Sequence, residues 1–289
     1  MSDHPVDSSR FPLTRRTFLW SSAQVAASLW LASKGVSIAA VQEEGYSAGN
    51  FYPLNPLADF VGSYVAPSGD VILNRPCTLQ FDLIGWEKKA FKKGKGALAA
   101  GEKINVLLGS LRIERLPQVD KIVYRLKRTL ETDSCEMEIV CRPDKWESVK
   151  TWKTTYGNSL SQTNGVAPLV ATGSVEGGKI QWRDGTVLRQ IPCPGLLLAD
   201  AALLFNAGKL AEIAAEGNEF CRLDQEGLPR IAQRFGKSAE AGGALDKKPL
   251  SAWLLTGRAT MPSHFIYDAQ GRPLFFTGLL VSAALKTIA

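Results

Sequence analysis

Histidine is the scarcest residue type for acid–base chemistry in this chain. The 289 residues include only two histidines, His4 and His264, which excludes metal centres of several histidines and the HExxH zinc motif. His264 lies in a strand-like segment, so Ser263 is expected on the opposite face, and no GxSxG motif occurs. We expect a structural or surface histidine; the alternative is a nucleophilic pair of His264 with a thiol such as Cys193 or Cys221.

Carboxylates offer two further candidates for acid–base chemistry. Glu136 and Glu138 share one face of a predicted strand, about 7 Å apart, a separation in the range of glycosidase pairs. Their alternation with apolar residues is ordinary for the solvent-facing side of a sheet, and we predict that role. Asp200 lies within an apolar, helix-like stretch, where we expect it at the edge that faces water. If it were buried, its pKa would be raised unless it were paired.

The cysteines are odd in number, so at least one is free or bonded to another molecule. They are Cys77, Cys135, Cys141, Cys193 and Cys221. Cys135 and Cys141 share one predicted strand, about 20 Å apart at ~3.4 Å per residue, which is too far for a disulfide. No CxxC motif occurs, so thioredoxin-type, zinc-ribbon and c-type haem sites lack their motifs. We expect buried free thiols, with one cross-strand disulfide as the alternative.

Motifs for binding anions are weak. Neither GxGxxG nor a Walker pattern occurs, and we predict no cofactor and no metal. A lysine cluster beside Trp86 and Phe91 could contact an anionic lipid headgroup, a polymer or a partner, although we expect a solvated loop. This cluster consists of Lys88, Lys89, Lys92, Lys93 and Lys95.

Arg15 and Arg16, near the start of the chain, are followed by Phe18 and Leu19. With this motif the first forty residues resemble a bacterial twin-arginine export signal. The mildly apolar stretch 19–33 has about 15 residues, short of the roughly 20 that a membrane span needs. Small residues then offer cleavage after position 39 or 40. The resemblance implies a periplasmic location, delivery by the twin-arginine export machinery and no stable transmembrane span.

Composition and charge describe an ordinary globular chain. Hydrophobic residues make up 45% and charged residues 21%. The net charge is +6, and the first forty residues contribute +2 of it. The remaining excess is too small to indicate nucleic-acid binding. We predict a single β-rich exported domain over residues 41–289, in which 41–70 form an irregular arm because Gly and Pro interrupt any long element.

The elements expected in that domain are mostly strands. Short strand-like runs between about residues 71 and 191 alternate with hairpin-turn signals, including Gly177-Gly178 and Asp184-Gly185. Residues 196–216 read as one or two helices, with a possible break at Gly208, and strand patterns resume from 219 to 284. The predicted fold class is α+β: a mostly antiparallel sheet, curled as a meander or half-barrel, packed on one or two helices.

The closing segments add a family resemblance. Pro262–Tyr267, the turn Asp268–Arg272 and the run Leu274–Ala284 follow the meander and the apolar helix. Over about residues 100–289 the chain resembles a group of exported bacterial proteins of unknown function. In that group an antiparallel sheet curls around a helix, similar to periplasmic lipoprotein carriers. The resemblance assigns no functional residue.

Aromatic side chains on the predicted strands point to binding rather than catalysis. Trp152, Tyr156, Trp182 and Trp253 are expected to line the concave side of the sheet. With no strong catalytic motif, they predict a non-catalytic periplasmic protein that binds an apolar or amphipathic ligand, such as a lipid, or a cell-envelope partner. One alternative is a cell-envelope hydrolase that uses a Cys or Asp with His264. The other is an accessory subunit of an exported complex.

Overall fold

The computed structural model describes residues 52–86, 105–158, 167–217, 219–238, 244–245, 248–278 and 280–289. These residues belong to one compact unit, Phe51–Ala289. The predicted export signal, the lysine cluster and the first part of the predicted arm lie outside the described residues.

Alternation of apolar and polar side chains produces β-strands through most of this unit. The strands are β1 (Cys77–Trp86), β2 (Asn105–Pro117), β3 (Ile122–Leu130), β4 (Asp133–Cys141), β5 (Val149–Asn158), β6 (Leu169–Glu176), β7 (Lys179–Asp184), β8 (Val187–Pro192), β9 (Leu197–Ala199), β10 (Phe220–Leu223), β11 (Pro229–Lys237), β12 (Ala244–Leu245), β13 (Lys248–Gly257), β14 (Thr260–Asp268), β15 (Pro273–Thr277) and β16 (Val281–Ile288). The helices are the 3-10 helix η2 (Tyr52–Leu57) and the α-helices α2 (Ala58–Val61), α5 (Asp200–Phe205) and α6 (Ala207–Glu216). Val71–Leu73, one of the strand-like runs, forms no strand.

The strands join in one mostly antiparallel sheet. Its order is β8-β7-β6-β5-β4-β3-β2-β1-β16-β15-β14-β13-β11-β10-β9, and β12 pairs with β13 beside this path. Strands β1 to β8 form a meander, and β1 then pairs with β16, the last strand of the chain. β9 and β10 run parallel. The predicted meander and the predominance of antiparallel strands are confirmed.

The apolar stretch predicted to begin a helix is divided between a strand and a helix. Leu197–Ala199 pairs with β10 as β9, and only Asp200–Phe205 forms a helix, α5. The break before α6 lies at Asn206, whose side chain accepts a hydrogen bond from the Lys209 backbone N–H, and not at Gly208. Asn206 therefore caps α6 in the manner that asparagine favours.

The closing run, predicted as one strand, is two. β15 and β16 are separated at Gly278, where a Cβ atom would lie 2.9 Å from the Val281 carbonyl oxygen. The predicted turn before β15 is present: the Asp268 carboxylate accepts from the backbone N–H groups of Gln270 and Arg272, at 3.0 and 2.9 Å.

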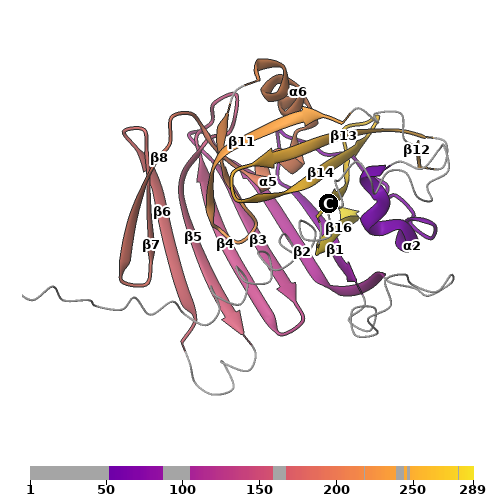
Figure 1. Ribbon diagram of the computed structural model, residues 1–289, viewed down its shortest axis with the longest axis horizontal. Helices are drawn as coiled ribbons and strands as arrows, with labels where there is room; N and C mark the ends of the chain where they lie inside the picture. The colour runs from indigo at the N-terminus through magenta and orange to yellow at the C-terminus, as the bar shows by residue number, and fades with distance from the viewer. Residues whose placement is uncertain are drawn as a thin grey trace, which may run out of the picture. The chain divides into compact units, whose positions relative to one another are not determined.

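The sheet curls around α5 (Figure 1). In this view β1 to β5 form the rear wall, β11, β13 and β14 lie in front, and α5 lies between them. The Tyr267 hydroxyl of β14 donates to the Leu203 carbonyl of α5 at 2.7 Å, and the rings of Tyr124 on β3 and Phe205 on α5 are 5.8 Å apart. The helix therefore contacts both walls, and the face of the sheet that it covers is called the inner face below.

Part of the predicted irregular arm is ordered against the outer face. η2 and α2 precede Tyr64, whose ring lies 4.6 Å from that of Phe275 and whose hydroxyl donates to the Leu285 carbonyl at 2.8 Å. Arg272 donates to the Pro67 carbonyl at 2.8 Å. Phe275 on β15 is fully buried because the arm covers it.

Candidate functional site

The end of the curled sheet is held by side chains, not by strand pairing. We call residues 224–228, which connect β10 to β11, the closing turn. The indole N–H of Trp152 donates to the Gly227 carbonyl at 3.1 Å, and the Tyr156 hydroxyl donates to the Glu226 carbonyl. Arg128 forms an ion pair with the Glu226 carboxylate at 2.8 Å. The turn thus fastens β10 and β11 to β3 and β5, and the sheet stays unclosed in its hydrogen bonding.

The sequence of the closing turn suits this contact. The Asp224 carboxylate accepts from the backbone N–H groups of Glu226 and Leu228, both at 2.9 Å, which is the local pattern that favours aspartate in turns. Gly227 has φ +74°, and a Cβ there would lie 2.2 Å from the Thr154 hydroxyl oxygen. Only glycine readily adopts this positive φ and also leaves room for the Thr154 hydroxyl.

Strands β6 to β8 continue past this closure as a three-stranded flap. Their register with β5 identifies the side chains on the inner face. Leu169 of β6 is opposite Tyr156 of β5. Gly173 of β6 lies between its two partners, Trp152 of β5 and Trp182 of β7. Arg189 and Val187 of β8 are opposite Trp182 and Asp184. We call the following set the inner flap face: Tyr156, Leu169, Trp182, Val187 and Arg189.

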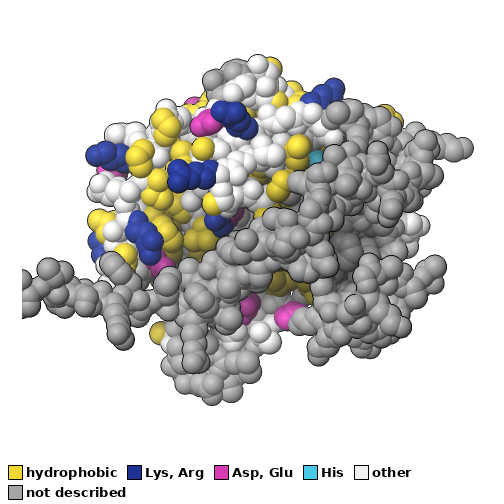
Figure 2. Space-filling model, in the orientation of Figure 1, with side chains coloured by type: hydrophobic (Ala, Val, Ile, Leu, Met, Phe, Trp, Pro, Cys, Tyr) yellow, Lys and Arg dark blue, Asp and Glu magenta, His cyan; other side chains and the backbone are white. Residues whose placement is uncertain are grey.

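The inner flap face is largely apolar and accessible; Arg189 is its cation, and the acid Asp184, opposite Val187, lies on the same face. Leu169 is 49% exposed and Val187 is 52% exposed. The Arg189 guanidinium lies over the Trp182 ring, 5.5 Å from its centre. Figure 2 shows hydrophobic side chains gathered over β5 to β8, at the left of this view, with lysine and arginine among them. Singly exposed apolar residues are common, but several on adjacent strands indicate a contact surface.

Three of the four predicted ligand-binding aromatic residues come together in this region. Trp152, Tyr156 and Trp182 lie on the inner face of β5 and β7, but Trp152 is 3% exposed and serves the closing turn. Its ring covers Gly173, where a Cβ would lie 2.1 Å from it. Trp253 lies elsewhere, on β13 opposite Phe265 and Lys237. Tyr156 and Trp182 remain as candidate contacts for a ligand.

A buried charge cluster was not among the sequence candidates. Glu147 follows β4 and accepts from Arg115 of β2 at 3.1 and 3.3 Å, and from the Tyr124 hydroxyl. Lys209 of α6 lies 2.7 Å from the same carboxylate. Burial alone would raise the pKa of Glu147, but Arg115, Lys209 and Tyr124 outweigh burial and lower it. The only sequence signal is an acid in a polar turn, and its partners lie on distant segments.

Asp200 is buried rather than at a solvent-facing edge. It is 1% exposed, and the Arg222 guanidinium of β10 donates to both carboxylate oxygens, at 2.5 and 2.6 Å. Burial raises the pKa of Asp200, while Arg222 opposes that rise. The expectation of a wet helix edge is therefore wrong, because α5 is covered by both walls of the sheet. The carboxylate is engaged in a buried pair that links α5 to β10.

The structure does not bring the hydrolase candidates together. Strand alternation places His264 on the face opposite Tyr267, whose hydroxyl reaches α5 and therefore the side where Asp200 lies. Cys193 follows β8, and its thiol is hydrogen-bonded to that of Cys221. Asp200 therefore lies on the other side of the sheet from His264, and Cys193 and Cys221 contact each other.

His264 makes folding stability depend on pH. Burial lowers its pKa from 6.5 to about 4. In the unfolded chain His264 takes up a proton below about pH 6.5, and in the folded chain it does not, so its effect on stability is constant above that pH and destabilises increasingly as pH decreases toward 4. We expect a loss of about 2–3 kcal/mol in this window. Denaturant unfolding at several pH values measures it, and His264→Gln should flatten the slope; an unchanged slope would contradict the assignment.

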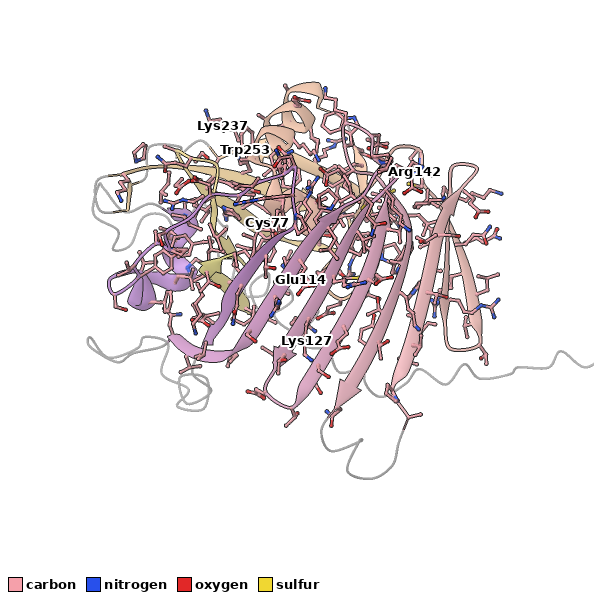
Figure 3. The ribbon with its side chains drawn as sticks, turned by 180° about the vertical axis from the view of Figure 1, so that it is seen from behind. Cys77, Glu114, Lys127, Arg142, Lys237 and Trp253 are labelled. Carbon is pink, nitrogen blue, oxygen red and sulfur yellow. The ribbon has the colours of Figure 1, made fainter. Side chains whose placement is uncertain are left out.

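Glu136 and Glu138 lie on the solvent-facing side of the sheet, as predicted. They pair with Lys127 at 2.8 Å and Arg125 at 3.1 Å, and all four side chains are exposed. Figure 3 shows Lys127 and Glu114 on this outer face. The same face carries an open depression of about 610 Å³ lined by these charges. These carboxylates are solvated and paired with cations, as is ordinary on the outer face of a sheet.

No group of three or more His, Cys, Asp or Glu in the described residues could hold a metal ion, and no helix among those residues has the length and apolar content of a membrane span. No protein-family model and no curated protein matches the chain. A similar solved structure is the beta-barrel-like protein of a domain of unknown function, DUF1849, from Brucella abortus. It is 10% identical, with a TM-score of 0.42, and the match covers 75% of this chain and 98% of that chain.

Proposed function

We propose that this chain is a non-catalytic, exported binding protein whose ligand is apolar or amphipathic and lies on the inner flap face. The observation that carries the proposal is the exposure of Leu169 and Val187 on the face that also carries Trp182, on strands that extend past the closing turn. Apolar walls with few polar groups are typical of sites for such ligands.

The single cation on this face supports an amphipathic ligand with an acidic group. Arg189 stacks over Trp182, so its guanidinium is held at one place on a largely apolar face, which also carries the Asp184 carboxylate opposite Val187. A carboxylate or phosphate could pair with it while an alkyl chain lies along Trp182, Val187 and Leu169. The inside of the curl is occupied by α5, and we therefore place the ligand on the flap.

The proposed location is the periplasm. The twin-arginine motif at Arg15 and Arg16, the short apolar stretch and the small residues near position 40 support it. Because substrates of that pathway fold before export, binding would occur after delivery of a folded chain.

Two adjacent residues of β8 provide a matched test. Val187 and Leu188 are 52% and 49% exposed, but they point to opposite faces of the flap. Titration of the protein with a fluorescent long-chain fatty acid should show binding. Val187→Asp should weaken it at least tenfold, because a carboxylate would meet the alkyl chain and repel the acidic group; this corresponds to about 1.4 kcal/mol. Leu188→Asp should change it less than twofold.

Two results would count against the ligand proposal. Wild-type protein that neither binds the fatty acid nor releases lipid on organic extraction, followed by mass spectrometry, would reject it. Equal weakening by Val187→Asp and Leu188→Asp would reject the placement on the inner face.

The free edge of β8 favours a second candidate, the accessory subunit. Within the described residues β8 pairs only with β7, and most of its side chains are exposed. An open edge offers backbone N–H and C=O groups to a partner strand. Recovery of one stoichiometric envelope partner, released by Leu188→Asp and retained by Val187→Asp, would favour this role over lipid binding.

A further inference from the structure

Cys193 and Cys221 form a contact that the proposed binding function does not use. Their thiols are hydrogen-bonded to one another, and both side chains are buried. The surrounding backbone fixes them: the Cys193 thiol lies 3.3 Å from the Gly195 carbonyl, and the Cys221 N–H donates to the Leu196 carbonyl at 2.8 Å. Two segments that are separate in the chain therefore present their sulfur atoms to each other.

The other three cysteines are placed differently. Cys77 begins β1, while Cys135 and Cys141 lie near opposite ends of β4, as the spacing of the two residues in one strand requires. The Cys135 thiol contacts the Gln225 carbonyl of the closing turn. These cysteines provide internal controls for any pairing experiment.

We propose that Cys193 and Cys221 are a redox pair that forms a disulfide by exchange with an external disulfide donor. The Cys193 thiolate attacks one sulfur of the donor and releases one donor thiolate. The Cys221 sulfur, having lost its proton, then attacks Cys193 in the mixed disulfide and releases the second donor thiolate. The chain loses two electrons and two protons, and the donor disulfide is reduced to two thiols.

The order of attack follows from the hydrogen bond between the thiols. The Cys193 thiol donates its proton to the Gly195 carbonyl, so in the contact between the two thiols its sulfur accepts from Cys221, which lowers the pKa of Cys193 and raises that of Cys221. Cys193 is therefore the more readily ionised sulfur, and the thiolate is the nucleophile in exchange. Because both thiols are buried, exchange with a bulky donor requires local opening of the chain around Cys193, and we expect it to be faster during folding or in mild denaturant.

The proposed bond would fasten the flap to the rest of the sheet. Cys193 directly follows β8, and its N–H donates to the Gly178 carbonyl in the turn between β6 and β7. Cys221 lies on β10, next to the closing turn. Oxidation would therefore join the free edge of the flap to β10 and enclose β9, α5 and α6 in one covalent loop. Cross-links of this loop size stabilise mainly by restricting the unfolded chain.

The test is oxidation of the full chain with oxidised glutathione, both in the native state and during refolding, followed by alkylation and peptide mass spectrometry. We expect a peptide that links Cys193 to Cys221 and a melting temperature at least about 5 °C higher than that of the reduced protein. Cys193→Ser and Cys221→Ser should each abolish the linked peptide and the shift. Cys77→Ser and Cys135→Ser should retain both.

The outcomes are independent of ligand binding. A different linked pair, or complete alkylation of Cys193 and Cys221 after both treatments, would overturn the proposal. It relies on the proposed export only for an oxidising compartment, and purified protein in glutathione tests it whether or not the fatty acid binds.

Discussion

Glu147→Gln is expected to lower the free energy of unfolding by about 3–5 kcal/mol, because it leaves two buried cations without their anion. Arg115 and Lys209 both contact this carboxylate, and all three side chains are buried. The carboxylate also joins β2, β3 and α6 at one point, since Tyr124 donates to it. Chemical denaturation followed by circular dichroism measures the loss.

A control variant at an exposed ion pair distinguishes the effect of burial on stability from the effect of losing a carboxylate charge. Glu136 forms an ion pair of similar length with Lys127, 2.8 Å, but both side chains are about 60% exposed. Glu136→Gln should therefore cost less than about 1 kcal/mol. Equal losses for the two variants would show that the buried cluster contributes no more than a surface pair.

The pH dependence of the Glu147 contribution adds a second readout. Because the pKa of Glu147 is lowered in the folded chain, its contribution is present above the pKa of the unfolded chain, about 4.3, and is lost as pH falls through the folded value. Glu147→Gln should therefore remove stability at neutral pH and reduce the slope below about pH 4. His264 acts in the window between about 6.5 and 4, so the two titrations are separable.

The fold was predicted to the extent that it depends on local pattern. The period-two alternation and the glycine turns predicted the meander, and strands β3 to β8 lie within the region, about 71–191, where strand-like runs were expected. The incorrect predictions concern segments whose structure is determined by pairing with residues distant in the chain. Leu197–Ala199 is as apolar as the helix that follows it, and it is a strand because β10 lies beside it. The closing run is divided at Gly278, where the Val281 carbonyl oxygen lies too close for a side chain, and alternation cannot show such an approach.

The candidate site was predicted only in part, for a related reason. The alternation pattern identified aromatic residues on strands. It could not show that Trp152 is buried by the closing turn, because the Gly227 carbonyl that accepts from its indole N–H is 75 residues away in the chain. Asp200 was a candidate because it interrupts an apolar stretch, but nothing in the sequence around Arg222 indicates that it pairs with Asp200. Glu147 was missed because an acid in a polar turn is usually solvated. Pairings of this kind depend on how the sheet curls, and no sequence period encodes them.

Asp200→Asn is expected to cost about 3–5 kcal/mol as well, because the Arg222 guanidinium would keep its charge in a buried place with a neutral partner. The ion pair is bidentate, and Asp200 is the first residue of α5, so its loss loosens the helix that both walls of the sheet contact. Thermal unfolding should show a decrease of roughly 10 °C. Asp82→Asn is the control, because Asp82 pairs with the exposed Lys286 at 3.1 Å and should lose under about 1 kcal/mol.

A double-mutant cycle distinguishes the cost of an unpaired charge from the value of the pair. Asp200→Leu and Arg222→Met should each destabilise strongly, while the double variant should recover most of the loss, because it leaves no buried charge. The coupling energy should then be several kcal/mol. Additive losses in the double variant would mean that each residue is needed separately, Asp200 to begin α5 and Arg222 to pack on β10. In that case the pair would not be what holds α5 inside the curl.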